Sequence, residues 1–123
     1  MRVLIIEPSV LARNVFRLLL RRLGDFAVEE FARIDDVPVG DVARAPYGLL
    51  LLGGHAFDRG GGMLRTLCTD VAAWQQIPKL IIAVPHGGSA PAPWSHLARS
   101  HVLTRPFTPA AFGTAVQQLV KDS

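Results

Sequence analysis

The feature that most constrains the fold is a regular alternation of short apolar runs with segments of helical periodicity. Runs of β-branched and leucine residues bounded by turn residues predict strands buried on both faces of a sheet. Apolar residues that recur every three or four positions predict amphipathic helices between those strands. Strict alternation of this kind predicts an α/β fold with a parallel sheet and helices on both faces. Five strands are predicted, at Arg2–Ile6, Phe26–Phe31, Tyr47–Leu52, Lys79–Val84 and His101–Thr104.

Five helices are predicted between and after the strands. Ser9 is a suitable N-cap for the first helix and Thr108 for the last, with Pro109 fitting the first helical position. Gly53–Gly62 is predicted to be a loop, because glycine at this density loses much backbone entropy in regular structure. The other three helices are predicted at Asp41–Ala45, Met63–Trp74 and Trp94–Arg99. The apolar face of the first helix is predicted from Val10, Leu11, Val15, Leu18 and Leu19.

Length and composition favour one compact domain spanning residues 1–123, because half of the residues are apolar and 19% are charged. The longest apolar run, Leu49–Leu52, is far shorter than the roughly 20 residues that span a bilayer. Cys68 is the only cysteine, and no secretory signal pattern is visible, so we expect a cytoplasmic domain. The net charge of +3 includes no basic block, which argues against DNA binding.

Three stretches, at 3–13, 46–52 and 102–107, carry a resemblance to the receiver domains of bacterial response regulators. The most specific is Val102-Leu103-Thr104-Arg105-Pro106-Phe107, which resembles the strand ending in Lys-Pro-Phe that precedes the last helix of receivers. The resemblance covers essentially the whole chain. It implies a flavodoxin-like (CheY-like) doubly wound fold with strand order 2-1-3-4-5, and a binding crevice at the carboxyl ends of the strands.

The same resemblance implies that the phosphorylation site is degenerate. Receivers hold a magnesium ion with two acidic residues after the first strand, accept phosphate on an aspartate after the third, and carry a hydroxyl residue at the end of the fourth. The acceptor position falls here on Leu52 or, with a shift of one residue, on Gly53, and the hydroxyl position on Ala83 or Val84. The degenerate pocket is therefore expected to consist of Glu7, Pro8, Leu52, Gly53, Ala83, Arg105 and Pro106.

The chemistry of these residues argues against phosphorylation. An acyl phosphate needs a carboxylate nucleophile, which neither leucine nor glycine provides. Magnesium prefers oxygen ligands, and Pro8 has no side-chain oxygen to add to that of Glu7. We therefore expect no metal, no cofactor and no catalytic residue. The expected function is that of a phosphorylation-independent pseudo-receiver, a receiver-like domain that binds a histidine kinase, an output protein or a second copy of itself.

Two surfaces are candidates for binding. Arg13, Arg17 and Arg21 recur every four residues and form one basic stripe, which is either a solvated helix face or a site for an anion such as a cyclic dinucleotide. The resemblance also implies a partner surface that includes Trp94, His101 and Val102.

Other features have weaker functional interpretations. Arg105 is a candidate to pair with Glu7, and the resemblance implies a cis peptide between Arg105 and Pro106. The loop residues His55, Asp58 and His86 could join Glu7 in a metal site, although solvated loop residues are the favoured interpretation. The backbone N–H groups of residues 53–62 could hold an anion, although a simple connector is favoured.

Overall fold

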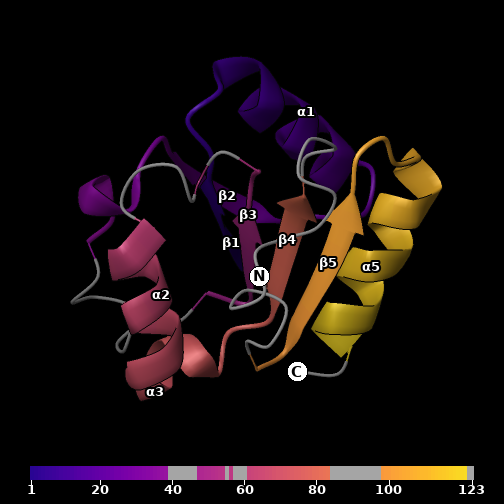
Figure 1. Ribbon diagram of the computed structural model, residues 1–123. Helices are drawn as coiled ribbons and strands as arrows, with labels where there is room; N and C mark the ends of the chain where they lie inside the picture. Colours follow the sequence, from indigo (N-terminus) through magenta and orange to yellow (C-terminus); the bar gives the residue numbers. More distant parts are fainter. Residues whose placement is uncertain (39–46, 55, 57–60, 84–97, 122–123) are drawn as a thin grey trace.

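The computed structural model describes residues 1–38, 47–54, 56, 61–83 and 98–121, and its centre is a five-stranded sheet (Figure 1). All strand pairs are parallel, and the strand order is β2-β1-β3-β4-β5. This order confirms the predicted CheY-like, flavodoxin-like fold class. The strands are β1 Arg2–Ile6, β2 Ala27–Phe31, β3 Leu49–Leu52, β4 Lys79–Ala83 and β5 Ser100–Thr104.

Helices cover both faces of the sheet, with α1 and α5 on one side and α2 and α3 on the other (Figure 1). Both predicted caps are confirmed: the Ser9 hydroxyl accepts a hydrogen bond from the N–H of Ala12, and the Thr108 hydroxyl accepts one from Ala111. None of the described helices is long and apolar enough to cross a bilayer. The described helices are α1 Val10–Arg21, the 3-10 helix η1 Ile34–Asp36, α2 Gly61–Asp70, α3 Ala72–Gln75 and α5 Pro109–Lys121.

Two helix predictions need correction. Gly61 and Gly62 were assigned to a loop but begin α2, where the first N–H groups of a helix need no intrahelical partner. The helix predicted at Met63–Trp74 is two helices, because Val71 adopts an extended conformation that ends α2 and caps α3. The helix predicted at 41–45 and residues 94–97 of the one predicted at 94–99 lie outside the described residues, whereas residues 98 and 99 form a turn.

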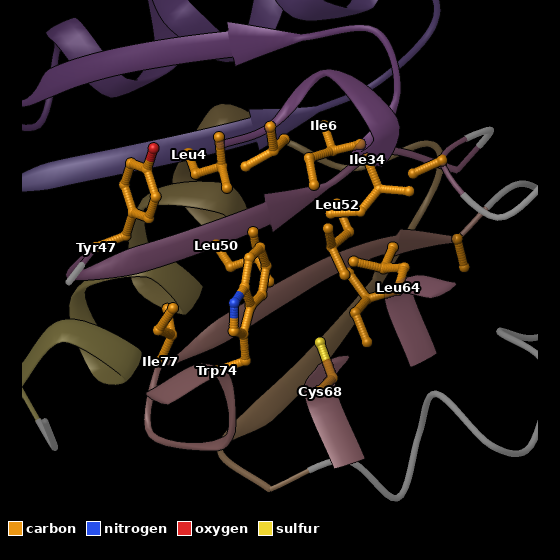
Figure 2. Close-up of a cluster of buried hydrophobic side chains, with 14 residues drawn as sticks. Leu4, Ile6, Ile34, Tyr47, Leu50, Leu52, Leu64, Cys68, Trp74 and Ile77 are labelled. Carbon is orange, nitrogen blue, oxygen red and sulfur yellow. The ribbon is translucent and has the colours of Figure 1, made fainter. Parts of the chain in front are cut away.

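Along the inner strands, successive side chains point alternately into two separate cores. Leu50 and Leu52 of β3 point to the core beneath α2 and α3, which Trp74 helps to fill (Figure 2). Leu49 and Leu51 point to the opposite core, beneath α1 and α5. Since β3 is fully buried on both faces, its continuous apolar sequence is explained by its central position.

The core beneath α1 and α5 is centred on aromatic side chains. Phe16 of α1 and Phe112 of α5 stack with ring centroids 6.4 Å apart and planes at 5°. Phe107, in the turn between β5 and α5, stacks on Phe112 at 5.9 Å. This aromatic contact fixes α1 and the β5–α5 turn beside one another at the carboxyl edge of the sheet.

Candidate functional site

The candidate site lies at the carboxyl edge of the sheet, where the chain leaves the ends of β1, β3, β4 and β5. Backbone pairing continues beyond the strands: the N–H of Gly53 donates to the carbonyl of Ile6 at 3.0 Å, and that of Arg105 to Ala83 at 3.1 Å. The residue after β1 and the residue after β3 are therefore held side by side. Ala83, which closes β4, is buried and adds only a methyl group to this edge.

Glu7 is a fully buried acid at the end of β1. Its backbone N–H donates to the carbonyl of Phe31 at 3.0 Å, which ties it to β2. Its Oε1 accepts a hydrogen bond from the backbone N–H of Ser9 at 3.1 Å. Its own carbonyl accepts one from Nη1 of Arg13 at 2.7 Å. The first and last of these contacts hold the Glu7 backbone, and the contact with Ser9 orients its carboxylate.

The Glu7 side chain lies directly over Gly53. A Cβ atom built on Gly53 would be 1.7 Å from Oε2 of Glu7 and 2.5 Å from its Cδ. Real Cβ atoms do not approach other atoms so closely, so position 53 has no room for a side chain while Glu7 keeps this conformation. Leu52 instead points into the core beneath α2. Of the two candidate acceptor positions, it is therefore Gly53 that faces Glu7.

The residues of this pocket do not fit a magnesium site. Glu7 supplies one carboxylate, whereas Pro8 and Gly53 supply no side-chain oxygen. Within the described part of the chain, no group of three His, Cys, Asp or Glu residues lies close enough to hold a metal ion. The remaining members of the proposed metal site, His55, Asp58 and His86, lie outside the described residues.

Arg105 does not pair with Glu7, and the predicted ion pair is wrong: no contact between them is present among the ion pairs of the described residues. The Glu7 carboxylate is turned towards Ser9 and Gly53, while the Arg105 guanidinium lies over the ring of Phe16, 5.8 Å from its centroid. The Arg105 Nε is buried and has no hydrogen-bond acceptor. The peptide between Arg105 and Pro106 is cis, as the resemblance implied.

The arginines of α1 differ from the predicted open basic stripe. Nη1 of Arg17 lies 2.7 Å from Oε2 of Glu30, and Nε of Arg13 lies 3.8 Å from its Oε1. Arg17 also donates to the side-chain oxygen of Asn14. Only Arg21 of the three has no such partner among the described residues and is exposed. Glu30, which lies on β2 and 13 residues after Arg17 in the sequence, therefore neutralises much of the stripe.

The predicted partner surface is described only in part. His101 is exposed on β5, and Val102 is half-buried against the core beneath α2 and α3. His101 lines a shallow hollow of about 320 Å³ with Arg99 and Gln118. Trp94 lies outside the described residues.

Cys68 and Lys79 are the ionisable core residues with shifted pKa values. Burial raises the pKa of the Cys68 thiol to about 11, so the thiol stays protonated at neutral pH. Burial lowers the pKa of Lys79, whose Nζ donates to the carbonyls of Gln75, Ile77 and Ala98. Both residues therefore have structural roles: the sulfur fills the core, and the ammonium satisfies carbonyls around the start of β4.

A groove between α1 and the β5–α5 turn was missed in the sequence. The predicted apolar face of α1 was expected to pack on the sheet, but only Phe16 and Leu20 of this helix are fully buried. Leu11 is 77% exposed and Val15 49% exposed. Both line a cavity of about 680 Å³ whose opposite wall includes Arg105 and Phe107. The sequence of α1 contains more apolar residues than one buried helical face can hold. This excess was the signal that could have indicated the groove.

Comparison with known proteins identifies the fold. No protein-family model and no curated protein sequence matches the chain. Solved structures do match along its whole length, and they include a candidate response regulator from Chloroflexus aurantiacus, with a TM-score of 0.77, 17% identity, and 98% of this chain and 97% of that chain covered.

Two further solved structures have the same fold. A signal receiver domain of a two-component histidine kinase from Clostridium thermocellum has a TM-score of 0.74 at 13% identity, covering 98% of this chain and 97% of its own. A CheY-like response regulator receiver domain from Methylobacillus flagellatus has a TM-score of 0.73 at 17% identity, covering 97% and 98%. At these identities the likeness shows the fold, and the chain has the CheY-like receiver fold.

Proposed function

We propose that this chain is a pseudo-receiver of bacterial two-component or phosphorelay signalling, which works through protein–protein contacts and without phosphorylation. The receiver fold supports the signalling class, since the solved structures with this fold include receiver domains of response regulators and of a histidine kinase. The partner is a histidine kinase or an output protein, and the domain is cytoplasmic, non-enzymatic and without a cofactor.

The observation that carries the proposal is the position of the Glu7 side chain over Gly53. In a receiver, the acceptor side chain after β3 must reach into the pocket beside the acidic residues that follow β1. Here the Glu7 carboxylate takes the space at that point, 1.7 Å from where a Cβ of residue 53 would be. Glu7 is fully buried, so the space is filled by a side chain of the protein itself. Among the described residues, the pocket has one acid and no acceptor after β3, and position 53 has no room for one.

Attempted phosphorylation is the direct test. The protein is incubated with acetyl phosphate and Mg²⁺, and separately with beryllofluoride, beside a receiver domain that retains its aspartate as the positive control. Intact-mass spectrometry is expected to show no phosphoryl adduct on this chain, and ¹⁹F NMR no bound beryllofluoride. An acid-stable, hydroxylamine-sensitive adduct, or a bound fluoride signal, would contradict the proposal.

The proposed interaction surface includes His101 and Val102 on β5, together with Trp94. Exposure of His101 beside the hollow lined by Gln118 of α5 supports a contact at this face. The same face is the candidate for a homodimer, which light scattering of the purified protein across a concentration series would detect. A His101→Glu variant should weaken that self-association if the β5–α5 face carries it.

The alternative function is binding of an anionic ligand, such as a cyclic dinucleotide, through Arg13, Arg17 and Arg21. Such a ligand would have to replace Glu30 as the partner of two of these arginines. Calorimetric titration with a cyclic dinucleotide separates the two functions, because a pure interaction module should give no heat of binding.

A further inference from the structure

The groove between α1 and the β5–α5 turn has the size and chemistry of a small-molecule site. Its volume is about 680 Å³, within the roughly 300–1,000 Å³ that small-molecule pockets occupy. One wall consists of side chains from α1, including Leu11 and Val15, and the other comes from the turn that leads into α5. The α1 wall also includes Phe16 and Leu19, and the turn contributes Arg105 and Phe107.

Arg105 is the one charged side chain among the described residues that line the groove. Its guanidinium lies over Phe16 and takes part in none of the ion pairs or side-chain hydrogen bonds found among the described residues. Its Nε is buried and has no acceptor in the described part of the chain, and a buried donor left without an acceptor is destabilising. An acceptor supplied from outside the protein would remove that cost.

Two other arginines, both on α1, do have an acidic partner. Arg13 and Arg17 are paired with Glu30 on β2. The nearest buried acid, Glu7, accepts from Ser9 and lies against Gly53. Among the described residues, Arg105 is therefore a cation without an anion, and the other lining residues of the groove are apolar apart from Ser9.

We propose that this groove binds a small amphipathic carboxylate, a ligand with an apolar chain or ring system and one terminal acid group. The apolar part lies along Leu11, Val15 and Leu19, and the carboxylate accepts hydrogen bonds from Arg105. A guanidinium matches a carboxylate in geometry and is weakly hydrated, so it suits a partly buried ion pair. A purely apolar ligand would leave the Arg105 donor unsatisfied, and a bare phosphate would leave the apolar walls exposed to water.

The test uses decanoate as the probe and decanol as its uncharged match, both below the concentration at which they form micelles or separate. Calorimetric titration of the whole chain with decanoate is expected to show saturable binding of one molecule. An Arg105→Met variant keeps the aliphatic stem and removes the charge. It is expected to lose affinity for decanoate by about tenfold or more, the worth of a hydrogen bond to a charged group, and to bind decanol unchanged.

Two neighbouring positions on α1 provide a matched control for the apolar wall. Leu11 and Val10 are both exposed, at 77% and 60%, but only Leu11 lines the groove. Leu11→Ala should weaken decanoate binding about fifteenfold, since roughly two methylene groups of contact are lost, whereas Val10→Ala should not. Circular dichroism confirms that each variant is folded.

Three outcomes would overturn the inference. Equal affinity of the parent protein for decanoate and decanol would show that Arg105 makes no contribution. Unsaturable binding, unaffected by Leu11→Ala, would show adsorption to the exposed face of α1. An acidic amphipathic peptide that binds at Arg105 when decanoate does not would show that the groove receives a protein helix instead.

Discussion

The carboxyl ends of β1 and β5 lie at the same edge of one sheet, and a charged residue follows each strand. The two charged residues differ in their hydrogen bonding. After β1, Glu7 is fully buried, hydrogen-bonded to the N–H of Ser9 and in contact with Gly53. After β5, Arg105 has a buried Nε with no acceptor and borders an open groove. The space after β1 is filled by the Glu7 side chain, whereas the Nε of Arg105 after β5 has no acceptor among the described residues.

This difference shows that two strand ends of one sheet can hold a charged residue in different surroundings. The β1–β3 side is constrained by backbone pairing on both flanks, so one acid and one glycine suffice to fill it. The β5 side ends in a turn held by aromatic stacking, and Phe16 of the neighbouring helix lies beneath the Arg105 guanidinium. Substitutions at the ends of β1 and β3 should therefore lower the free energy of unfolding strongly, whereas substitutions after β5 should change it little.

Gly53→Ala should have the largest effect. The added Cβ would meet Glu7 at 1.7 Å, and overpacking of this kind in a rigid site costs about 3 kcal/mol of unfolding free energy. Urea unfolding followed by circular dichroism measures it. The double variant with Glu7→Ala removes the two closest atoms and leaves a Cβ contact of 2.8 Å, so it should recover part of the loss. Additive effects of the two changes would show that the residues are not in contact.

Glu30→Gln should have an intermediate effect, because it releases Arg13 and Arg17, and Arg13 in turn holds the carbonyl of Glu7. Since the pairs are half-exposed, the expected loss is about 1 kcal/mol at low salt, falling as salt is added. Asp35→Asn, which removes the exposed pair with Arg33, is the control and should change stability little. Equal losses for the two variants would remove the special role given to Glu30.

Arg105→Met should have the smallest effect on stability, within about 0.5 kcal/mol in either direction. The variant loses the contact between the guanidinium and Phe16, which is worth about 0.5–1 kcal/mol. It also removes a buried donor that has no acceptor among the described residues, and this gain opposes the loss. Thermal unfolding in the absence of any added ligand measures the balance. A loss as large as that of Gly53→Ala would mean that Arg105 has an acceptor in solution.

The fold was predictable because the three inner strands β1, β3 and β4 are mostly continuous apolar runs and each cap is a local signal. Leu49–Leu52 identified the central strand, and Ser9 identified the start of α1 without any knowledge of tertiary contacts. The strand order came from the resemblance to receivers, since periodicity does not specify which strands are neighbours.

The contacts within the site were less predictable. Opposite charges at the ends of β1 and β5 favoured a pair between Glu7 and Arg105, yet each side chain has a closer competing contact, Ser9 for one and Phe16 for the other. Sequence gives the charges of side chains but not their directions. The neutralisation of α1 by Glu30 was missed for the same reason, because it depends on a strand that lies beside the helix only after folding.

The contact between Glu7 and Gly53 also has a consequence for the ancestry and engineering of this chain. A single change that brought aspartate to position 53 would create a steric conflict before it created an acceptor for phosphate. Introducing a side chain at position 53 therefore requires position 7 to change first or at the same time, so the order of mutations is constrained. The residues after the adjacent strands β1 and β3 are thus coupled by epistasis.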